Sequence, residues 1–129
     1  MGTPTAVPPP STRILRALHL RCPECGSAGL FRHWFRLRPT CQGCGLKLDR
    51  GHPDHFVGAY LVNLIIAELL FAGGLAAWLL AVWPEVPWER IETVAVLAMV
   101  LAPLATYPFT RTVWLAADLI FDPPRASDR

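Results

Sequence analysis

The chain has 129 residues, of which 53% are hydrophobic and 17% charged, and its formal net charge is +2. This length suits one compact unit rather than several domains. The small net charge argues against a dedicated nucleic-acid-binding protein, because such proteins carry a strongly basic surface. Apolar residues are concentrated after residue 55, whereas eight of the twelve basic residues precede residue 56. We therefore expect a polar N-terminal part and a membrane-embedded C-terminal part.

Residues 1–20 are predicted to be a disordered or interfacial N-terminal segment. The first twelve residues hold four prolines and no apolar run, a composition that is typical of disorder. Residues 13–20 are basic and amphipathic. They would form two helical turns on a lipid surface, or else a strand or loop that packs on the module that follows.

All four cysteines lie in two C-x-x-C pairs, with fifteen residues between the inner cysteines. This spacing is typical of a site in which four thiolates hold zinc. A glycine after each pair allows the tight turn that brings two sulfurs together. Redox-active pairs or disulfides are less favoured, because no βαβ pattern surrounds the cysteines and a cytosolic location keeps thiols reduced. The predicted ligands are Cys22, Cys25, Cys41 and Cys44.

The predicted metal is structural Zn²⁺, because four cysteines leave no open position for catalysis. The cysteine spacing does not separate zinc from iron. A module of some thirty residues buries too little apolar surface to fold alone, so the metal would form its core. A second metal site at Asp49, His52, Asp54 and His55 is less favoured than a solvated loop.

The segment between the cysteine pairs alternates in character, which predicts strand. We therefore expect a small β zinc ribbon over residues 21–50. One side of the alternation holds an aromatic residue among arginines, a composition that is typical of interface anchors. The candidate partner surface consists of Arg32, Trp34, Arg36 and Arg38.

Residues 51–121 are predicted to hold a linker, a transmembrane hairpin and an interfacial helix. Two apolar stretches, at about 56–83 and 91–110, are each long enough to cross a bilayer. Residues 113–121 would continue as an amphipathic helix or as a helical extension, and residues 122–129 as a disordered tail. The predicted fold is thus a membrane α-helical hairpin of two transmembrane helices with an N-terminal zinc ribbon.

The distribution of basic residues predicts the orientation in the membrane. The turn between the spans holds one arginine and mostly acids, whereas basic residues gather before the first span and after the second. Both termini should therefore face the cytoplasm, which agrees with reduced, metal-bound cysteines.

Four polar residues form a candidate intramembrane site: Asn63, Glu68, Thr106 and Arg111. An acid at mid-bilayer depth costs about 2.5–3.5 kcal/mol, so it needs a partner or a proton. An antiparallel register centred on the turn would place Glu68 opposite Ala105 and Thr106, and Asn63 opposite Thr110 and Arg111. Glu68 is then either a neutral acid that bonds across the hairpin or a functional carboxylate. Small residues such as Gly73 and Gly74 would let the helices approach closely.

These features resemble a bacterial family known as domain of unknown function 983. The resemblance is carried by the motif Cys22-Pro23-Glu24-Cys25-Gly26 with Leu30-Phe31, by the second C-x-x-C-G at Cys41 to Gly45, and by the two membrane helices. It spans roughly residues 20 to 124 and implies a multi-pass protein of the bacterial inner membrane. Many members carry a histidine where Asn63 stands here, so a role of that histidine does not transfer.

The expected function is non-enzymatic: a membrane-anchored cytoplasmic zinc ribbon that acts as a protein-interaction or assembly module. Its expected partners are membrane lipid and either another protein or a second copy of the chain. One alternative is a subunit of a membrane transport or enzyme complex that uses Glu68. Another, less favoured, is a membrane-tethered nucleic-acid binder that uses Arg32, Trp34, Arg36 and Arg38. The sequence identifies no small-molecule substrate.

Overall fold

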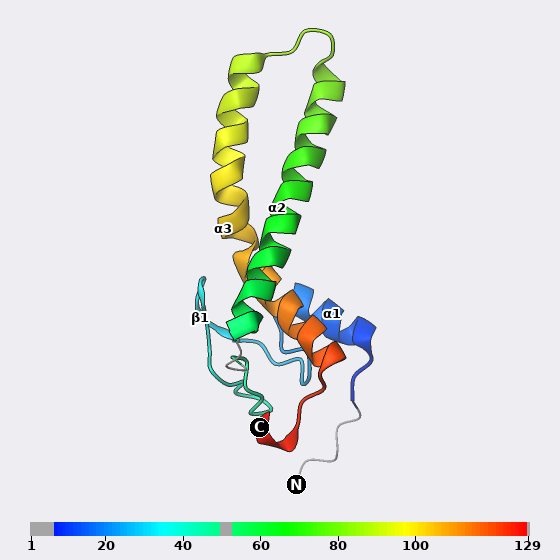
Figure 1. Ribbon diagram of the computed structural model, residues 1–129, viewed down its shortest axis with the longest axis vertical. Coiled ribbons are helices and arrows are strands. Elements are labelled where there is room, and N and C mark those ends of the chain that lie inside the picture. Colours follow the sequence, from blue (N-terminus) through cyan, green and yellow to red (C-terminus); the bar gives the residue numbers. More distant parts are fainter. Residues whose placement is uncertain (1–6, 50–52, 129) are drawn as a thin grey trace.

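The computed structural model describes residues 7–49 and 53–128, with side chains in the second range from residue 57 onward. Two long antiparallel helices form a hairpin, and a smaller polar module lies at the end of the hairpin away from its turn (Figure 1). Both described ends of the chain lie at this same end of the molecule. The elements in order are α1 (Pro10–Leu18), β1 (Phe31–His33), β2 (Arg36–Leu37), α2 (Pro53–Val82), α3 (Trp88–Phe121) and the 3₁₀ turn η1 (Ala126–Asp128).

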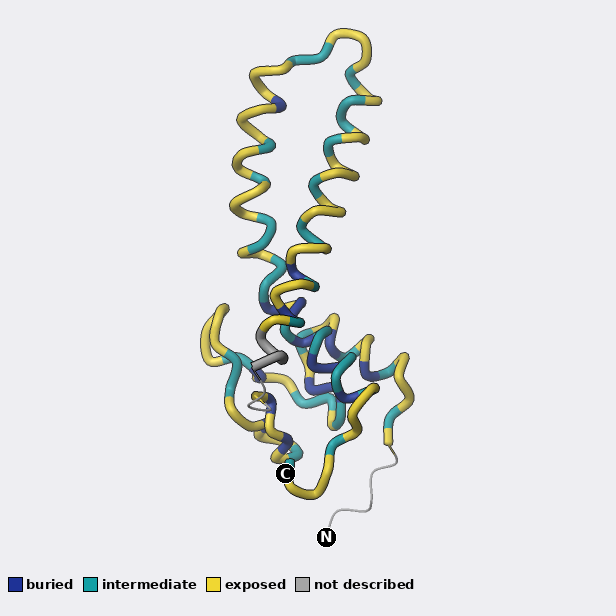
Figure 2. The backbone as a smooth tube through the Cα atoms, in the orientation of Figure 1, coloured by how far each residue is buried: buried dark blue, intermediate teal, exposed yellow. Residues whose placement is uncertain are grey.

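Helices α2 and α3 are both long and apolar enough to cross a membrane. The core helix of a soluble protein would be mostly buried, yet none of the most apolar stretch of α2 is buried in the described structure. Exposed residues predominate along both helices toward the turn (Figure 2). Apolar side chains on all faces of an uncovered helix are typical of lipid contact. The two predicted spans are therefore confirmed as candidate membrane helices.

Helix α3 is continuous from Trp88 to Phe121, so the predicted second span and the predicted helix over residues 113–121 form one element. Its 34 residues reach about 51 Å, whereas a bilayer core is about 30 Å thick. Pro103 and Pro108 lie inside the helix without ending it. Residues such as Thr112, Leu115 and Leu119 beyond the prolines are buried, so this last part serves as a platform for the polar module.

Helix α1 packs on this platform, and its buried residues Arg13 and Ala17 are one helical turn apart. The Thr112 hydroxyl donates a hydrogen bond to the Ala17 carbonyl, at 2.8 Å. Residues 10–18 are therefore a helix and not a disordered segment, whereas contact of this helix with lipid stays a prediction. Eight amphipathic residues suggest a helix but give no information on what covers it, and here α3 covers it.

The polar module and α3 share one hydrophobic core, so the cysteine pairs do not form a domain separate from the long helices. Leu115 and Leu119 of α3 are fully buried against the segment that carries the cysteines, residues 21–49, which we call the cysteine module. The residues that the cysteine module contributes to this core are Cys22, Leu30, Cys41, Leu46 and Leu48. A unit too small to bury its own core is thus completed by a helix from the far end of the chain.

The sheet of the cysteine module is a single two-stranded hairpin. Phe31 pairs with Leu37 and His33 with Arg36, and the alternating segment therefore turns at residues 34 and 35. An isolated bridge joins Thr40 to Lys47 near the second cysteine pair. The β ribbon predicted over residues 21–50 is present only in this reduced form.

The C-terminal tail is ordered against the cysteine module in the described residues, so the prediction of a disordered tail over residues 122–129 is wrong for this part. The Lys47 amide donates to the Asp128 carbonyl and its ammonium donates to the Ser127 carbonyl, each at 2.8 Å. These bonds hold the turn η1 against the module, and the turn itself is closed by the Asp128 amide, which donates to the Arg125 carbonyl at 3.0 Å.

The helices of the hairpin are in close contact where Gly58 of α2 lies against the ring of Trp114 of α3. A Cβ atom at position 58 would lie 2.0 Å from the Trp114 ring. A side chain at this position would therefore force the helices apart.

We expect Gly58→Ala to destabilise the protein by about 1–3 kcal/mol, the usual cost of overpacking. The measurement is the thermal unfolding midpoint of the full chain in detergent, followed by tryptophan fluorescence. Gly73→Ala is the matched control, because no atom lies within 4 Å of a Cβ built at Gly73. Alanine has the better helix propensity, so this control should unfold at the same or a higher temperature. Equal midpoints for the two variants would contradict the close crossing.

Candidate metal centre

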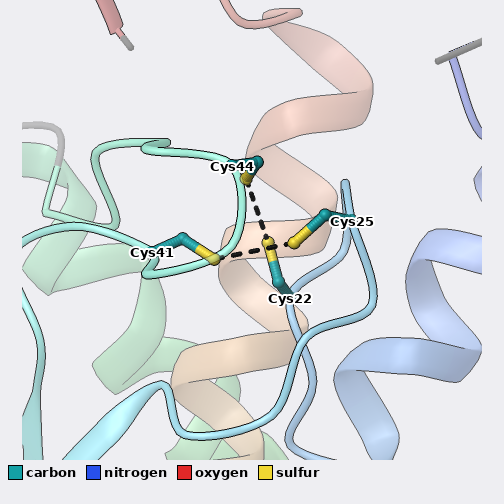
Figure 3. A group of neighbouring side chains, drawn as sticks. All are labelled: Cys22, Cys25, Cys41 and Cys44. Carbon is teal, nitrogen blue, oxygen red and sulfur yellow. Dashed lines mark hydrogen bonds between the residues drawn. The ribbon is translucent and has the colours of Figure 1, made fainter. Parts of the chain in front are cut away.

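The four cysteine side chains converge on one point (Figure 3). The sulfurs of Cys22 and Cys44 are 3.8 Å apart, and those of Cys25 and Cys41 are 3.7 Å apart. All four sulfurs lie within 4.8 Å of one another, and none is in a disulfide. Tetrahedral zinc with Zn–S distances of about 2.3 Å requires sulfurs about 3.8 Å apart. The four donors therefore fit one tetrahedral metal ion.

The two cysteine pairs adopt the same local conformation, which the glycines make possible. The amide of Gly26 donates to the carbonyl of Cys22 at 2.8 Å, and that of Gly45 donates to Cys41 at 2.9 Å. The φ angles of the two glycines are +76° and +73°, in the left-handed region that residues with a side chain rarely adopt. Each turn holds two sulfurs on one side of its backbone, as the sequence pattern predicts.

The thiols differ in acidity because their surroundings differ. Burial raises the pKa of Cys22 well above its usual value and raises that of Cys44 to about 11. Burial would also raise the pKa of Cys41, but hydrogen bonds from Ser27 and from nearby backbone amides outweigh it and lower the pKa to about 6. Metal binding must therefore displace the protons of Cys22 and Cys44.

Ser27 is a contributor to the centre that the sequence patterns did not reveal. Its hydroxyl lies 3.1 Å from the sulfurs of both Cys25 and Cys41. Such outer contacts orient thiolate ligands and partly neutralise their charge. Gly43 allows this arrangement, because a Cβ there would lie 2.8 Å from the Ser27 hydroxyl and 3.1 Å from the Cys25 sulfur.

Four protein donors complete a tetrahedral site, so a metal bound here has no open position for water or a substrate. Thiolate ligands suit zinc and also iron, and the geometry does not separate them. In the described part of the chain, these cysteines form the group with metal-binding geometry. Of the alternative second site, His52 and the side chains of Asp54 and His55 lie outside the described residues.

Two arginines of α1 contact the first cysteine turn, one of them also contacts the end of α3, and no sequence motif marks them. One guanidinium nitrogen of Arg16 donates to the Glu24 carbonyl at 2.6 Å. Arg13, 4% exposed, forms a buried ion pair with the Glu24 side chain. The other arm of its guanidinium donates to the Leu119 carbonyl at 2.6 Å. Carbonyls near a helix C-terminus lack intrahelical partners, so Arg13 ties α1, the metal centre and the end of α3 together.

Of the candidate intramembrane residues, Asn63 and Thr106 come together across the hairpin. The Thr106 hydroxyl donates to the Asn63 side-chain oxygen at 2.8 Å, and the Asn63 amide donates to the Pro103 carbonyl at 3.4 Å. The predicted register, with Glu68 opposite Thr106 and Asn63 opposite Thr110, is therefore wrong by about one helical turn. Register in a hairpin follows from the packing at the crossing, which turn length alone does not specify.

Glu68 lies apart from that pair, on the open side of the hairpin. Its side chain is exposed and makes no hydrogen bond or ion pair within the described structure. It lines a cleft of about 230 Å³ between α2 and α3, together with apolar residues that include Leu64, Met99 and Ala102. The predicted bond across the hairpin is thus absent, because Thr106 is held by Asn63. Arg111 instead lines a small cavity beside Asn63.

The candidate partner surface of Arg32, Trp34, Arg36 and Arg38 lies on the β hairpin, which runs beside α3 (Figure 1). The Trp34 indole N–H donates to the Leu104 carbonyl at 2.9 Å. The neighbouring Phe35 ring stacks obliquely on Tyr107 with a centroid separation of 5.4 Å. The tip of the hairpin is therefore attached to the apolar part of α3 and does not project away from the helices.

A model of a family described as "Protein of unknown function (DUF983)" matches residues 31–118, about two thirds of the chain. The match includes the second cysteine pair and both long helices, and it begins after the first pair. No curated protein and no solved structure matches the chain.

Proposed function

The chain belongs to the DUF983 family, and we propose that it is a membrane-anchored zinc-ribbon protein that serves as an assembly module for another integral membrane protein. The metal holds the cysteine module together on the cytoplasmic side of a bacterial inner membrane, where thiols stay reduced. The hairpin α2–α3 anchors it and carries the contact surface for the partner within the bilayer.

The observation that carries the proposal is the exposed carboxyl group of Glu68. It lies about ten residues from the nearer end of the α2 membrane stretch, Val57–Val82, and so at roughly half the depth of the bilayer. Ionisable residues at this depth usually face a partner rather than lipid. Within the described chain Glu68 has no bonding partner, so a second membrane chain would cover it.

The open side of the hairpin supports the same conclusion. The helices are in close contact near Gly58 and Trp114, but apolar clefts of about 190 and 230 Å³ separate them nearer the turn. No atom lies within 4 Å of Cβ atoms built at Gly73 and Gly74, so these glycines do not serve the expected close approach of α2 to α3. Small residues beside a polar group are the usual contact surface for another membrane helix.

The test is photo-crosslinking in native membranes from a benzoylphenylalanine at Met99, which lines the Glu68 cleft and is 62% exposed. Leu80, 82% exposed near the turn, is the control position. We expect a protein adduct from position 99 that is several-fold weaker from position 80. Glu68→Leu should abolish it, whereas Glu68→Gln should keep it, because the amide still forms hydrogen bonds.

The mass of the adduct identifies the partner. An adduct of twice the chain mass would indicate a homo-oligomer. An adduct of larger or smaller mass would indicate that the partner is a different protein. Adducts with lipid alone, or a protein adduct that Glu68→Leu leaves unchanged, would refute the proposal.

A subunit of a transport or enzyme complex is the second candidate, and the same carboxyl group favours it. Two helices do not enclose a pathway, so this role also requires a partner around Glu68. The transport or enzyme role differs from the assembly role in its response to Glu68→Gln. This substitution would preserve the complex in both cases, but it would remove proton or ion exchange at position 68 and so abolish transport or catalysis.

A further inference from the structure

We infer that the chain has a binding site for the phosphate of a membrane glycerophospholipid, formed by Arg32, Arg36 and Arg111. The inference depends on the membrane anchoring proposed above, but it does not depend on a protein partner. It rests on a basic cleft between the β hairpin and α3, on the depth at which this cleft lies, and on the aromatic residues beside it.

The cleft has a volume of about 300 Å³ and is lined by residues from both parts of the structure. Arg32 and Arg36 come from the β hairpin and Arg111 comes from α3, together with Leu37, Pro39 and Asp49. Among the described lining residues, three guanidinium groups and one carboxylate give a formal charge of +2. Guanidinium groups present several N–H donors in a planar fork that matches phosphate geometry.

The sequence of α3 indicates the depth of this cleft. Arg111 is the first charged residue of the helix after Glu92, so it marks the end of the apolar stretch. Tyr107 lies one turn earlier, and the Arg111 guanidinium lies 5.9 Å from the centre of its ring. Tyrosine and tryptophan gather at the level of the headgroups, and arginines there reach the phosphates. The cleft would therefore lie in the phosphate layer.

The tip of the β hairpin extends from this layer toward the bilayer core. Leu104, whose carbonyl accepts the Trp34 bond, precedes Arg111 by seven residues, or about 10 Å along the helix. Pro108 has no N–H and so leaves this carbonyl without its helical donor. The indole N–H replaces that donor. Trp34 and Phe35 remain 51% and 54% exposed, as suits rings in contact with the upper acyl chains.

Lipid accounts for these features better than a soluble anion does. A free phosphate would be bound by the arginines alone and would not require exposed aromatic rings about 10 Å deeper. A glycerophospholipid brings a phosphate to the arginines and acyl chains to Trp34 and Phe35 in one molecule.

The experiment measures lipid bound to the full chain, purified in detergent and observed by native mass spectrometry. The probes are dioleoylphosphatidylglycerol, dioleoylglycerol, which lacks the phosphate, and inorganic phosphate. We expect wild type to retain phosphatidylglycerol and the variant Arg32→Gln/Arg36→Gln to bind it at least about tenfold more weakly, because two charge-assisted contacts are lost. Dioleoylglycerol should bind weakly to both.

Arg21→Gln is the matched control, because Arg21 is an exposed arginine of the same module outside the cleft lining. It should retain phosphatidylglycerol as wild type does. Unchanged zinc content in every variant would show that the module remains folded. The lipid assignment is overturned by equal phosphatidylglycerol retention in wild type and the double variant, by binding of dioleoylglycerol as strong as that of phosphatidylglycerol, or by displacement of the lipid by millimolar inorganic phosphate.

Discussion

Replacement of Cys22 by serine is expected to remove bound zinc from the purified protein and to unfold the cysteine module. Cys22 is fully buried in the core that joins the module to α3. Zinc contributes roughly 10–16 kcal/mol of apparent free energy in small zinc-binding peptides. A module that lacks a complete core of its own cannot replace such a contribution.

The loss of the metal from Cys22→Ser can be monitored by two measurements. Elemental analysis should fall from about one zinc per chain to a small fraction, as expected when one of four ligands is removed. Trypsin should then cleave faster at the arginines of the β hairpin, because their backbone is no longer held between paired strands. Gln42→Ser is the control, because Gln42 is exposed in the second cysteine turn and its side chain forms no part of the sulfur cluster. Full zinc content in Cys22→Ser would contradict the four-sulfur centre.

The second large effect is expected from Arg13→Met, which leaves the Glu24 carboxylate buried and without its partner. Removal of one member of a buried ion pair typically costs 3–5 kcal/mol. The carbonyl of Leu119 also loses its donor at the end of α3. For a chain of this size, the unfolding midpoint in detergent should fall by roughly 10 °C or more. Arg21→Met, at an exposed arginine, should change the midpoint little.

A second substitution separates the ion pair from simple loss of packing. In Arg13→Met/Glu24→Gln no unpaired charge remains, so we expect the double variant to be more stable than Arg13→Met alone. If the losses of unfolding free energy from the two single substitutions add up in the double variant, the two charges are not coupled. If Arg13→Met fails to accumulate, the single variant Glu24→Gln still tests the pair through its smaller shift in midpoint.

The features that the sequence predicts correctly are those that depend on neighbouring residues. Each cysteine pair with its glycine specifies one turn, and the geometry of the turn determines where two sulfurs point. The apolar stretches likewise extend over enough consecutive residues to indicate helices of membrane-spanning length. The sequence leaves open whether residues 113–121 form a separate amphipathic helix or extend the second span. They extend it, because the cysteine module, rather than water, covers the last turns of α3.

The features that the sequence does not predict depend on contacts between distant segments. Arg13 and Leu119 are 106 positions apart, and Trp34 and Leu104 are 70 apart. No periodicity of the sequence relates these residues. The sequence therefore predicts a disordered or lipid-bound segment where α1 lies, and an exposed partner surface around Trp34. The predicted register of the hairpin is wrong for the same reason, since it depends on how the Trp114 ring fits against Gly58.

The amino-acid sequence by itself determined the four cysteines of the candidate metal centre, the two apolar helices and the membership of the family, because these features depend on motifs and composition within short stretches of the chain. Only the tertiary structure decided that the end of α3 is the platform for α1 and the metal centre, and that Asn63 rather than Glu68 bonds to Thr106. It also decided that Arg32, Arg36 and Arg111 line one cleft. These outcomes follow from the packing of side chains that meet only after the chain has folded, when buried polar groups must find partners.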